Sequence, residues 1–256
     1  MPGTESLSIL ELIILGAILL VGGGVHGLLG FGFPLLATPL MAMLVDVRTA
    51  MLILLIPTMG INIASIAQGG RAKLSIGRFW PLAVCVAGGS MAGTRLLILT
   101  DPAPYKLLLA VVLLFYLTVQ QRGLQMPWVG RHPRAAMVAF GLAAGLLAGT
   151  VNAAVPALIV YALELGLAPR VTVPVFNFCF LTGKLAQALT FGAAGLFSAE
   201  IILPTLPAAL LALTGLWAGT RLRGRVDTDT YRRWLRATLF VIAISLAIQY
   251  AIGRWS

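Results

Sequence analysis

The sequence predicts an all-α integral membrane protein built from two inverted repeats of about five transmembrane segments each, with short broken helices near the membrane midplane. Three observations lead to this prediction. The composition is 59% hydrophobic and only 10% charged, with a mean hydropathy of +0.98, whereas soluble proteins carry roughly 25% charged residues. Apolar runs alternate with short basic clusters, and two motifs recur in the same order in both halves. These features argue against a soluble enzyme, a nucleic-acid-binding domain or a disordered chain.

Ten apolar segments follow one another along the chain. They are approximately 7–26, 33–45, 49–69, 79–99, 104–121, 135–149, 153–167, 172–197, 200–220 and 234–252. Most approach the ~20 residues that span a bilayer as a helix. A cleaved signal peptide usually begins with basic residues. The first segment has none before it, so we expect it to be a retained helix. Segments 33–45 and 153–167 are short, and each follows a stretch rich in helix-breaking residues.

The two helix-breaking stretches belong to an internal duplication. One runs from Gly27 to Pro34 and the other from Gly149 to Pro156, an offset of 122 residues. A second motif, Gly93-Thr94-Arg95-Leu96, recurs as Gly219-Thr220-Arg221-Leu222 at an offset of 126 residues. Two motifs in register indicate a repeat. We therefore divide the chain into an N-terminal repeat (1–121), a basic cytoplasmic linker (122–134) and a C-terminal repeat (135–256).

The basic residues distinguish between two topologies. If the two short segments do not cross the membrane, the two faces carry seven and ten basic residues. If they do cross, one face carries thirteen and the other four. Cytoplasmic loops collect Lys and Arg, so we prefer ten crossings, inverted repeats and both termini outside the cytoplasm. The same clusters indicate anionic membrane lipids as partners rather than nucleic acid.

The two breaks are candidates for a substrate site. Unpaired backbone groups are tolerated at membrane depth only where they are buried inside the protein or line a cavity. Inverted-repeat transporters place broken helices of this kind near the midplane. Gly30, Phe31, Gly32 and Asn152 lie at the breaks, immediately before segments that begin with proline. We expect them to form a cradle for an anion at two helix N-termini. The alternative is tight helix packing by small residues.

Lys184 lies near the middle of segment 172–197, and an intramembrane lysine suggests a functional site. Asn177 and Gln187 share its helical face. Asn62 occupies the position of Lys184 in the first repeat. We expect Lys184 to supply positive charge to an anionic substrate, with Asn62, Asn177 and Gln187 as hydrogen-bond donors. Alternatively, Lys184 extends to the interface or pairs with Glu164.

Three further residues are candidates for coupling or gating. His26 lies beside the first break and could relay protons. Arg95 and Arg221 follow the pairs Gly89/Gly93 and Gly215/Gly219, whose spacing favours close helix packing, so anchoring at helix ends is the preferred role over a gate. No metal-ligand spacing, nucleotide-binding motif or catalytic constellation occurs. We therefore expect neither an enzyme nor a cofactor.

These residues make the chain resemble the TauE/SafE family, also called the sulfite exporter or toluene-sulfonate uptake permeases. The resemblance rests on Gly27 to Pro34, on Gly145-Leu146-Leu147-Ala148-Gly149 leading to Pro156, and on the repeated Gly-Thr-Arg-Leu blocks. It covers about residues 9–252. It implies a multi-pass secondary transporter of the bacterial inner (cell) membrane for sulfite, sulfoacetate or related sulfonates. The chain departs from the family pattern at Asn152-Ala153-Ala154, where the second repeat often has further glycines.

The sequence thus predicts a transporter that moves a small anion by alternating access, driven by a proton or sodium gradient. An anion channel would share the breaks and Lys184, and a membrane assembly subunit without transport activity is a third interpretation. The substrate, the direction of transport and homo-oligomer formation stay open.

Overall fold

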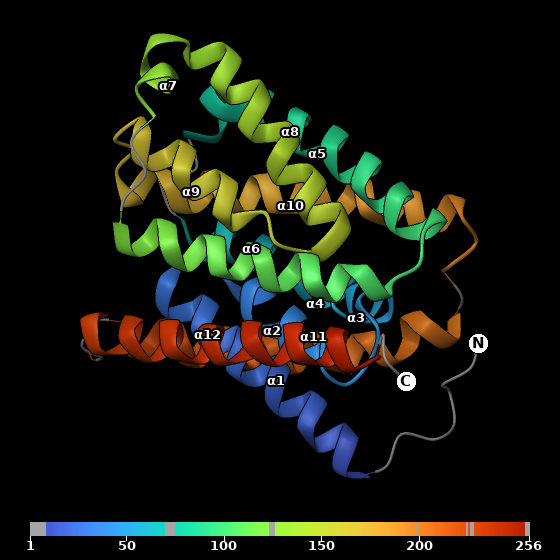
Figure 1. The fold of residues 1–256 in the computed structure, drawn as a ribbon. Helices are drawn as coiled ribbons and strands as arrows, with labels where there is room; N and C mark the ends of the chain where they lie inside the picture. The colour runs from blue at the N-terminus through green and yellow to red at the C-terminus, as the bar shows by residue number, and fades with distance from the viewer. Residues whose placement is uncertain are drawn as a thin grey trace.

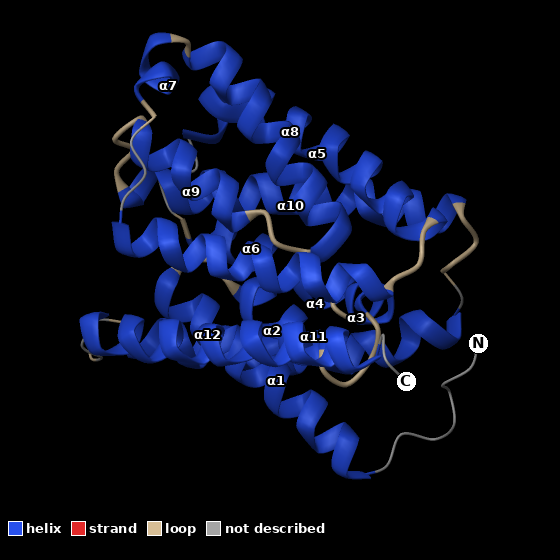
Figure 2. Cartoon of the chain, viewed as in Figure 1, coloured by secondary structure: helices blue, strands red, loops and turns tan. Residues whose placement is uncertain are grey.

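In a computed structural model, the described residues are 9–69, 75–122, 126–197, 199–223, 225 and 228–253. Within them the chain forms twelve helices and no strand (Figure 2). The first repeat contains α1 (Ile9–Leu29), α2 (Phe33–Ala42), α3 (Val47–Ile53), α4 (Leu55–Gln68), α5 (Ile76–Leu99) and α6 (Ala103–Arg122). After α7 (Pro127–Arg131), the second contains α8 (Pro133–Val151), α9 (Val155–Glu164), α10 (Pro169–Ala193), α11 (Ala199–Leu222) and α12 (Thr228–Gly253). The basic residues Arg71, Lys73 and Arg254 lie outside the described residues.

Each of the ten apolar segments forms helix, so the all-α prediction is confirmed. Within the described residues, five helices can cross a membrane by length and composition, namely α1, α5, α6, α8 and α12, and the pair α3–α4 counts as a sixth. The short segments form α2 and α9, which have ten residues each and so extend only ~15 Å, half of the ~30 Å hydrocarbon core. The protein is therefore a multi-pass membrane protein with two short internal helices.

The segment expected at 49–69 is not a single helix. It divides at Leu54 into α3 and α4, which bend by 48° relative to one another. Pro57 provides the physical reason, because a proline ring clashes with the carbonyl four residues earlier and lacks the N–H that would bond it. That carbonyl belongs to Ile53, the last residue of α3. The linker also contains a helix, α7, which the sequence did not predict.

The helices pack in the same pattern in both repeats. α1 packs along α11, and α8 packs along α5. The two pairs are equivalent, since α8 corresponds to α1 and α5 corresponds to α11. α4 meets α10, and α6 meets α12. Each of these pairs joins one repeat to the other, so the two halves form one interlocked bundle rather than two separate domains. Figure 1 shows α6 and α12 lying side by side on the front of this bundle.

Glycines bring the backbones at these crossings into contact. A Cβ added to Gly219 would lie 2.1 Å from the carbonyl oxygen of Gly24, and one added to Gly145 would lie 2.2 Å from that of Val86. No side chain fits such a space, so glycine is required at these positions. The close packing expected of the Gly89/Gly93 and Gly215/Gly219 pairs is thus present in both repeats.

The contacts also give the relative directions of the helices. Residues 16, 20 and 24 of α1 meet 211, 215 and 219 of α11, and residues 85, 89 and 93 of α5 meet 141, 145 and 149 of α8. Both pairs are therefore parallel. α5 also runs parallel to α10, because Ser90 and Thr94 bond Gly183 and Gln187. Gly30, just after α1, meets Val173 and Asn177 in the first turns of α10. If α1 and α10 cross the same bilayer, α1 therefore runs against α10 and α5, and so against its own equivalent, α8. This arrangement is consistent with inverted repeats.

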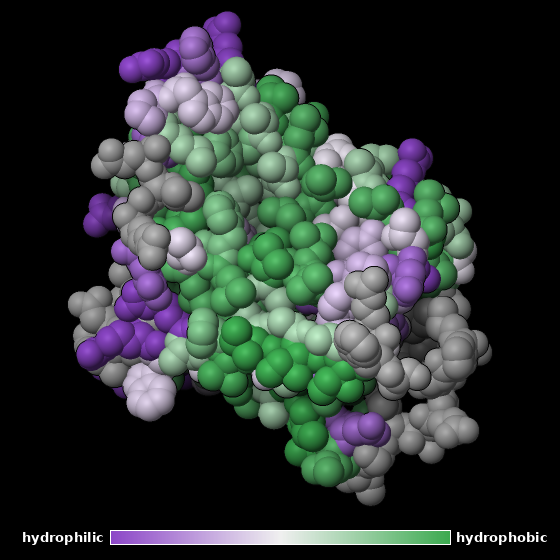
Figure 3. Space-filling model, viewed as in Figure 1, coloured by the Kyte–Doolittle hydropathy of each residue, from purple (hydrophilic) through white to green (hydrophobic). Residues whose placement is uncertain are grey.

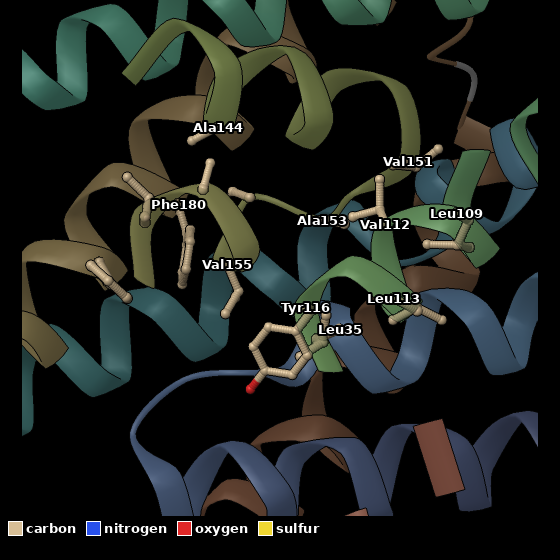
Figure 4. Close-up of a cluster of buried hydrophobic side chains, with 14 of the residues drawn as sticks. Leu35, Leu109, Val112, Leu113, Tyr116, Ala144, Val151, Ala153, Val155 and Phe180 are labelled. Carbon is tan, nitrogen blue, oxygen red and sulfur yellow. The ribbon is translucent and has the colours of Figure 1, made fainter. Parts of the chain in front are cut away.

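The surface and the core fit a membrane environment. Figure 3 shows hydrophobic residues across the middle of one face, with hydrophilic residues toward its margins. Large apolar side chains such as Leu99 and Leu189 are 81% and 71% exposed, as expected where lipid replaces water. The buried core joins the repeats, since Leu35 and Tyr116 of the first meet Val155 and Phe180 of the second in one cluster (Figure 4).

Candidate functional site

The two breaks share a left-handed residue at the equivalent positions Gly30 and Asn152, and they differ two residues later, where Gly32 has a positive φ and Ala154 a φ of −72°. After α1, Gly30 and Gly32 adopt φ angles of 86° and 109°, and after α8, Asn152 adopts a φ of 60°. The amide of Gly30 donates to the carbonyl of His26, and the amide of Asn152 donates to that of Ala148, the same bond shifted by one repeat. These left-handed conformations suit glycine and asparagine. They end one helix and allow the next to start in a new direction.

Hydrogen bonds tie each break to the opposite repeat. Asn152 Nδ2 donates to Thr38 Oγ1 of α2 at 2.8 Å. Asn177 Nδ2 of α10 donates to the carbonyl of Gly30 at 2.7 Å. The second break therefore holds the short helix of the first repeat, and the first break is held by the long helix that carries Lys184. Both breaks converge on α10.

A buried cavity lies where these elements meet. Its lining includes Pro34 in the first turn of α2, Ala154 and Val155 at the start of α9, and Lys184 and Gln187 of α10. Thr58, Ser90, Ala148, Asn152, Phe180 and Gly183 complete the lining. The space accessible to water is about 20 Å³, and a single water needs roughly 10–15 Å³. The site thus has room for about one water.

The lining combines two helix N-termini with one lysine and, among the described residues, includes no carboxylate. The N-terminus of an α-helix bears about half a positive elementary charge, and those of α2 and α9 both reach the cavity. Lys184, only 4% exposed, adds an amino group whose Nζ donates to Gln187 Oε1 and which carries a full positive charge when protonated. Gln187 Nε2 in turn donates to Thr94 Oγ1 at 3.3 Å. An uncompensated buried cation is costly, so this cavity is suited to an anion as counter-charge.

Lys184 points to this cavity rather than to the alternatives considered from sequence. It neither reaches a membrane interface nor bonds Glu164, since its hydrogen-bond partner is Gln187. Asn152, Lys184 and Gln187 are therefore brought together. Gly30 and Asn177 do not line this cavity and are joined to each other by the Asn177 bond.

A second buried polar group lies beside the first break. His26 is fully buried, its Nε2 lies 3.0 Å from Ser65 Oγ, and its Nδ1 accepts from the Phe33 amide at 3.4 Å. Asn62, one turn before Ser65, is fully buried and neither atom of its amide has a hydrogen-bond partner; the Oδ1 of Asn177 is unpartnered too. At the repeat offset, Asn62 and Ser65 correspond to Lys184 and Gln187. This group is the first-repeat counterpart of the Lys184 site, without its positive charge.

The remaining predicted residues lie elsewhere. Phe31 is partly buried and lines a larger cavity on the other side of the break. Gly32 caps α2. Arg95 and Arg221 are exposed, and the Arg221 guanidinium stacks 3.7 Å from the ring centre of Trp217, which fits the anchoring role. The structure does not bring either arginine to the Lys184 cavity.

Three hydroxyl residues of the site were not selected from the sequence. Ser90 donates to the Gly183 carbonyl at 2.8 Å, Thr94 accepts from Gln187, and Thr38 accepts from Asn152. Ser90 and Thr94 each follow a glycine of the α5 packing motif. A hydroxyl residue after each of two glycines that bring helices together was the sequence signal that could have identified them. In the described part of the chain, His, Cys, Asp and Glu form no group of three that could hold a metal.

Comparisons with known proteins agree with the sequence motifs. A family model described as "Sulfite exporter TauE/SafE" matches residues 14–246, nearly the whole chain. Neither the curated proteins nor the solved structures searched gave a match. The resemblance inferred from the glycine-rich breaks and repeated blocks is therefore confirmed at the level of the family.

Proposed function

The chain belongs to the sulfite exporter TauE/SafE family, and from this premise we propose that it is a secondary transporter carrying sulfite or a small sulfonate by alternating access. The Lys184 cavity carries this proposal, because two helix N-termini and one lysine converge there without a carboxylate. Oxyanions bind at helix N-termini through backbone N–H groups and the helix dipole. Lys184, Gln187 and Asn152 would contact the anion, and Gly30 and Asn177 would hold the first break.

The closed cavity supports a carrier over a channel. A channel needs a continuous path, whereas the space at Lys184 holds about one water. In a carrier, this conformation is a state between inward-open and outward-open forms, and rocking of the repeats opens it to either side. The polar group of His26, Asn62 and Asn177 is the candidate region for the coupling ion, either a proton or sodium.

Basic residues support an orientation for this transporter. With ten membrane segments, thirteen basic residues lie on one face and four on the other, so we place the first face in the cytoplasm of a bacterial cell and both termini outside. A reporter fused after Ser256 should then be active only outside the cytoplasm. Cytoplasmic activity of that reporter would contradict this orientation.

Flux into liposomes tests the function directly. Liposomes containing the purified protein should take up radiolabelled sulfite with saturation and with dependence on an imposed ion gradient. Lys184→Met should raise the KM about 10- to 150-fold, because a hydrogen bond to a charged group contributes about 1.5–3 kcal/mol. Lys106→Met, which removes a lysine from α6 outside the cavity, is the matched control.

The outcomes separate the three interpretations. Saturable flux whose KM rises with Lys184→Met and stays unchanged with Lys106→Met supports the carrier. Fast flux without saturation would indicate a channel. The absence of flux for every small oxyanion tested, from protein that unfolds cooperatively, would indicate a subunit without transport activity.

A further inference from the structure

A second, larger cavity opens on the opposite side of the first break. Its volume is about 410 Å³, and it lies between α6, α9, α12 and the start of α10. The polar residues in its lining are Tyr116, Gln120, Thr172 and Arg236, and its apolar lining includes Leu29 and Phe31. We call it the vestibule. Gln120 is near the end of α6 and Arg236 near the start of α12, so the vestibule lies toward the basic end of the bundle, at the left of Figure 1.

A row of three aromatic rings in contact joins the lining of the vestibule to the lining of the Lys184 cavity. Phe31, in the vestibule lining, meets Phe176 edge-on with ring centres 5.8 Å apart. Phe176 meets Phe180 with centres 6.0 Å apart, and Phe180 lines the Lys184 cavity. Phe176 is 1% exposed and Phe180 6%, so both are fixed in the core by α10. Phe31 is the member of this row that belongs to the break.

The backbone on both sides of Phe31 is adapted to movement. Gly30 and Gly32 both have positive φ angles, a region that glycine occupies and leaves with little steric cost. A Cβ on Gly32 would meet no atom within 4 Å, so packing does not explain the glycine there. A residue between two such glycines can change its backbone direction at lower steric cost than one between residues with side chains.

The duplication provides an internal comparison. The second-repeat equivalent of Phe31 is Ala153, flanked by Asn152 and Ala154. Ala153 has no bulk that could close a path, and the Asn152 side chain is tied to Thr38. Each break is tied to the other repeat by an asparagine side chain, but of the two only the first combines a large side chain with two glycines of positive φ.

From this asymmetry we propose that Phe31 is the gate between the vestibule and the Lys184 cavity, and that the vestibule is the path by which the anion enters or leaves on the basic face. The inference rests on the proposed function, since it assigns a route to the same site. When Phe31 packs on Phe176 the cavity is closed, as here. Rotation about Gly30 and Gly32 into the vestibule, which has room for a ring, opens it.

Thiol modification tests the gate without relying on transport. In a protein with Cys85→Ala and Cys179→Ala, Thr58→Cys places one thiol in the Lys184 cavity. The probe is 2-sulfonatoethyl methanethiosulfonate, a small membrane-impermeant anion. Phe31→Ala should speed modification at least about tenfold, equivalent to about 1.4 kcal/mol, and only when the probe is added to the face that carries Arg236. Phe31→Leu, which keeps most of the bulk, should restore the slow rate.

A matched control removes an aromatic ring elsewhere. Phe140→Ala deletes a ring that stacks on Trp128 at 6.0 Å, away from the row, and should leave the rate unchanged. If Phe31→Ala does not fold, Gly32→Ala takes its place. It adds a methyl group into open space but restricts the backbone, so it should slow anion flux while keeping the thiol protected.

Equal rates for folded Phe31→Ala and the unsubstituted protein would overturn the gate, as would an equal increase with Phe140→Ala. These results leave the transport proposal standing if the protein still moves sulfite. Conversely, faster modification with Phe31→Ala in a protein that transports no anion would support the gate geometry and contradict the proposed function.

Discussion

Two neighbouring glycines of α5 allow a sharp test of how the repeats interlock. A Cβ on Gly89 would lie 2.3 Å from the Leu142 carbonyl oxygen of α8, which is 0.7 Å inside the 3.0 Å limit that real Cβ contacts respect. A Cβ on Gly88 would meet no atom within 4 Å. Gly89→Ala must therefore push α5 and α8 apart at a cost of about 1–3 kcal/mol. Gly88→Ala should stabilise by about 0.5–1 kcal/mol, because alanine is the better helix former.

Thermal unfolding of the purified protein in detergent measures this difference. At about 2–4 °C per kcal/mol for a chain of this size, Gly89→Ala should lower the Tm by about 2–12 °C and Gly88→Ala should raise it by about 1–4 °C. Gly215, the equivalent of Gly89 in the second repeat, places its added Cβ 2.1 Å from the Leu20 carbonyl oxygen, so Gly215→Ala should cost as much. Equal Tm values for Gly88→Ala and Gly89→Ala would refute the close approach of α5 and α8.

Two further substitutions test the polar groups at the breaks. Asn62→Leu should raise the Tm, because a buried amide without partners costs about 1–3 kcal/mol. It should also lower sulfite flux if that amide serves an ion during transport. A lower Tm would show that Asn62 has a structural partner. Asn152→Gly should keep the left-handed backbone and lose only the bond to Thr38, whereas Asn152→Ala should lose about 1–2 kcal/mol more from backbone strain. Equal unfolding temperatures for these two variants would contradict the strain argument.

The helices could be predicted from sequence because lipid imposes strong constraints. Every backbone polar group within a bilayer needs an internal partner, so each long apolar run must be helix, and the structure agrees for all ten segments. The breaks were equally visible, since glycines and prolines at Gly30, Gly32 and Pro34 are incompatible with a continuous helix. The bend at Leu54 was missed. Pro57 was a signal for it, but a proline alone does not predict a bend, since Pro81 and Pro174 lie inside continuous helices.

The site was only partly predictable, since its partners come from other helices. Lys184 and Gln187 stood out because polar groups in an apolar run are costly. Which residues face them depends on the crossing of α5 with α10, and this crossing brings Ser90 and Thr94 to the site. The position of Phe31 between two cavities likewise depends on where Phe176 lies. Spacing along one helix predicts a shared face, but it does not predict what that face meets.

Binding of the anion at Lys184 is the central claim, and an anomalous difference map tests it most directly. Crystals of the protein soaked with selenite, an analogue of sulfite whose selenium scatters anomalously, should show one selenium peak between the first turns of α2 and α9, within about 4 Å of Lys184 Nζ, since a selenite oxygen lies between the two atoms. The peak should be absent with Lys184→Met. A selenite peak confined to the basic surface, or one that persists at full height in the Lys184→Met crystals, would contradict this account.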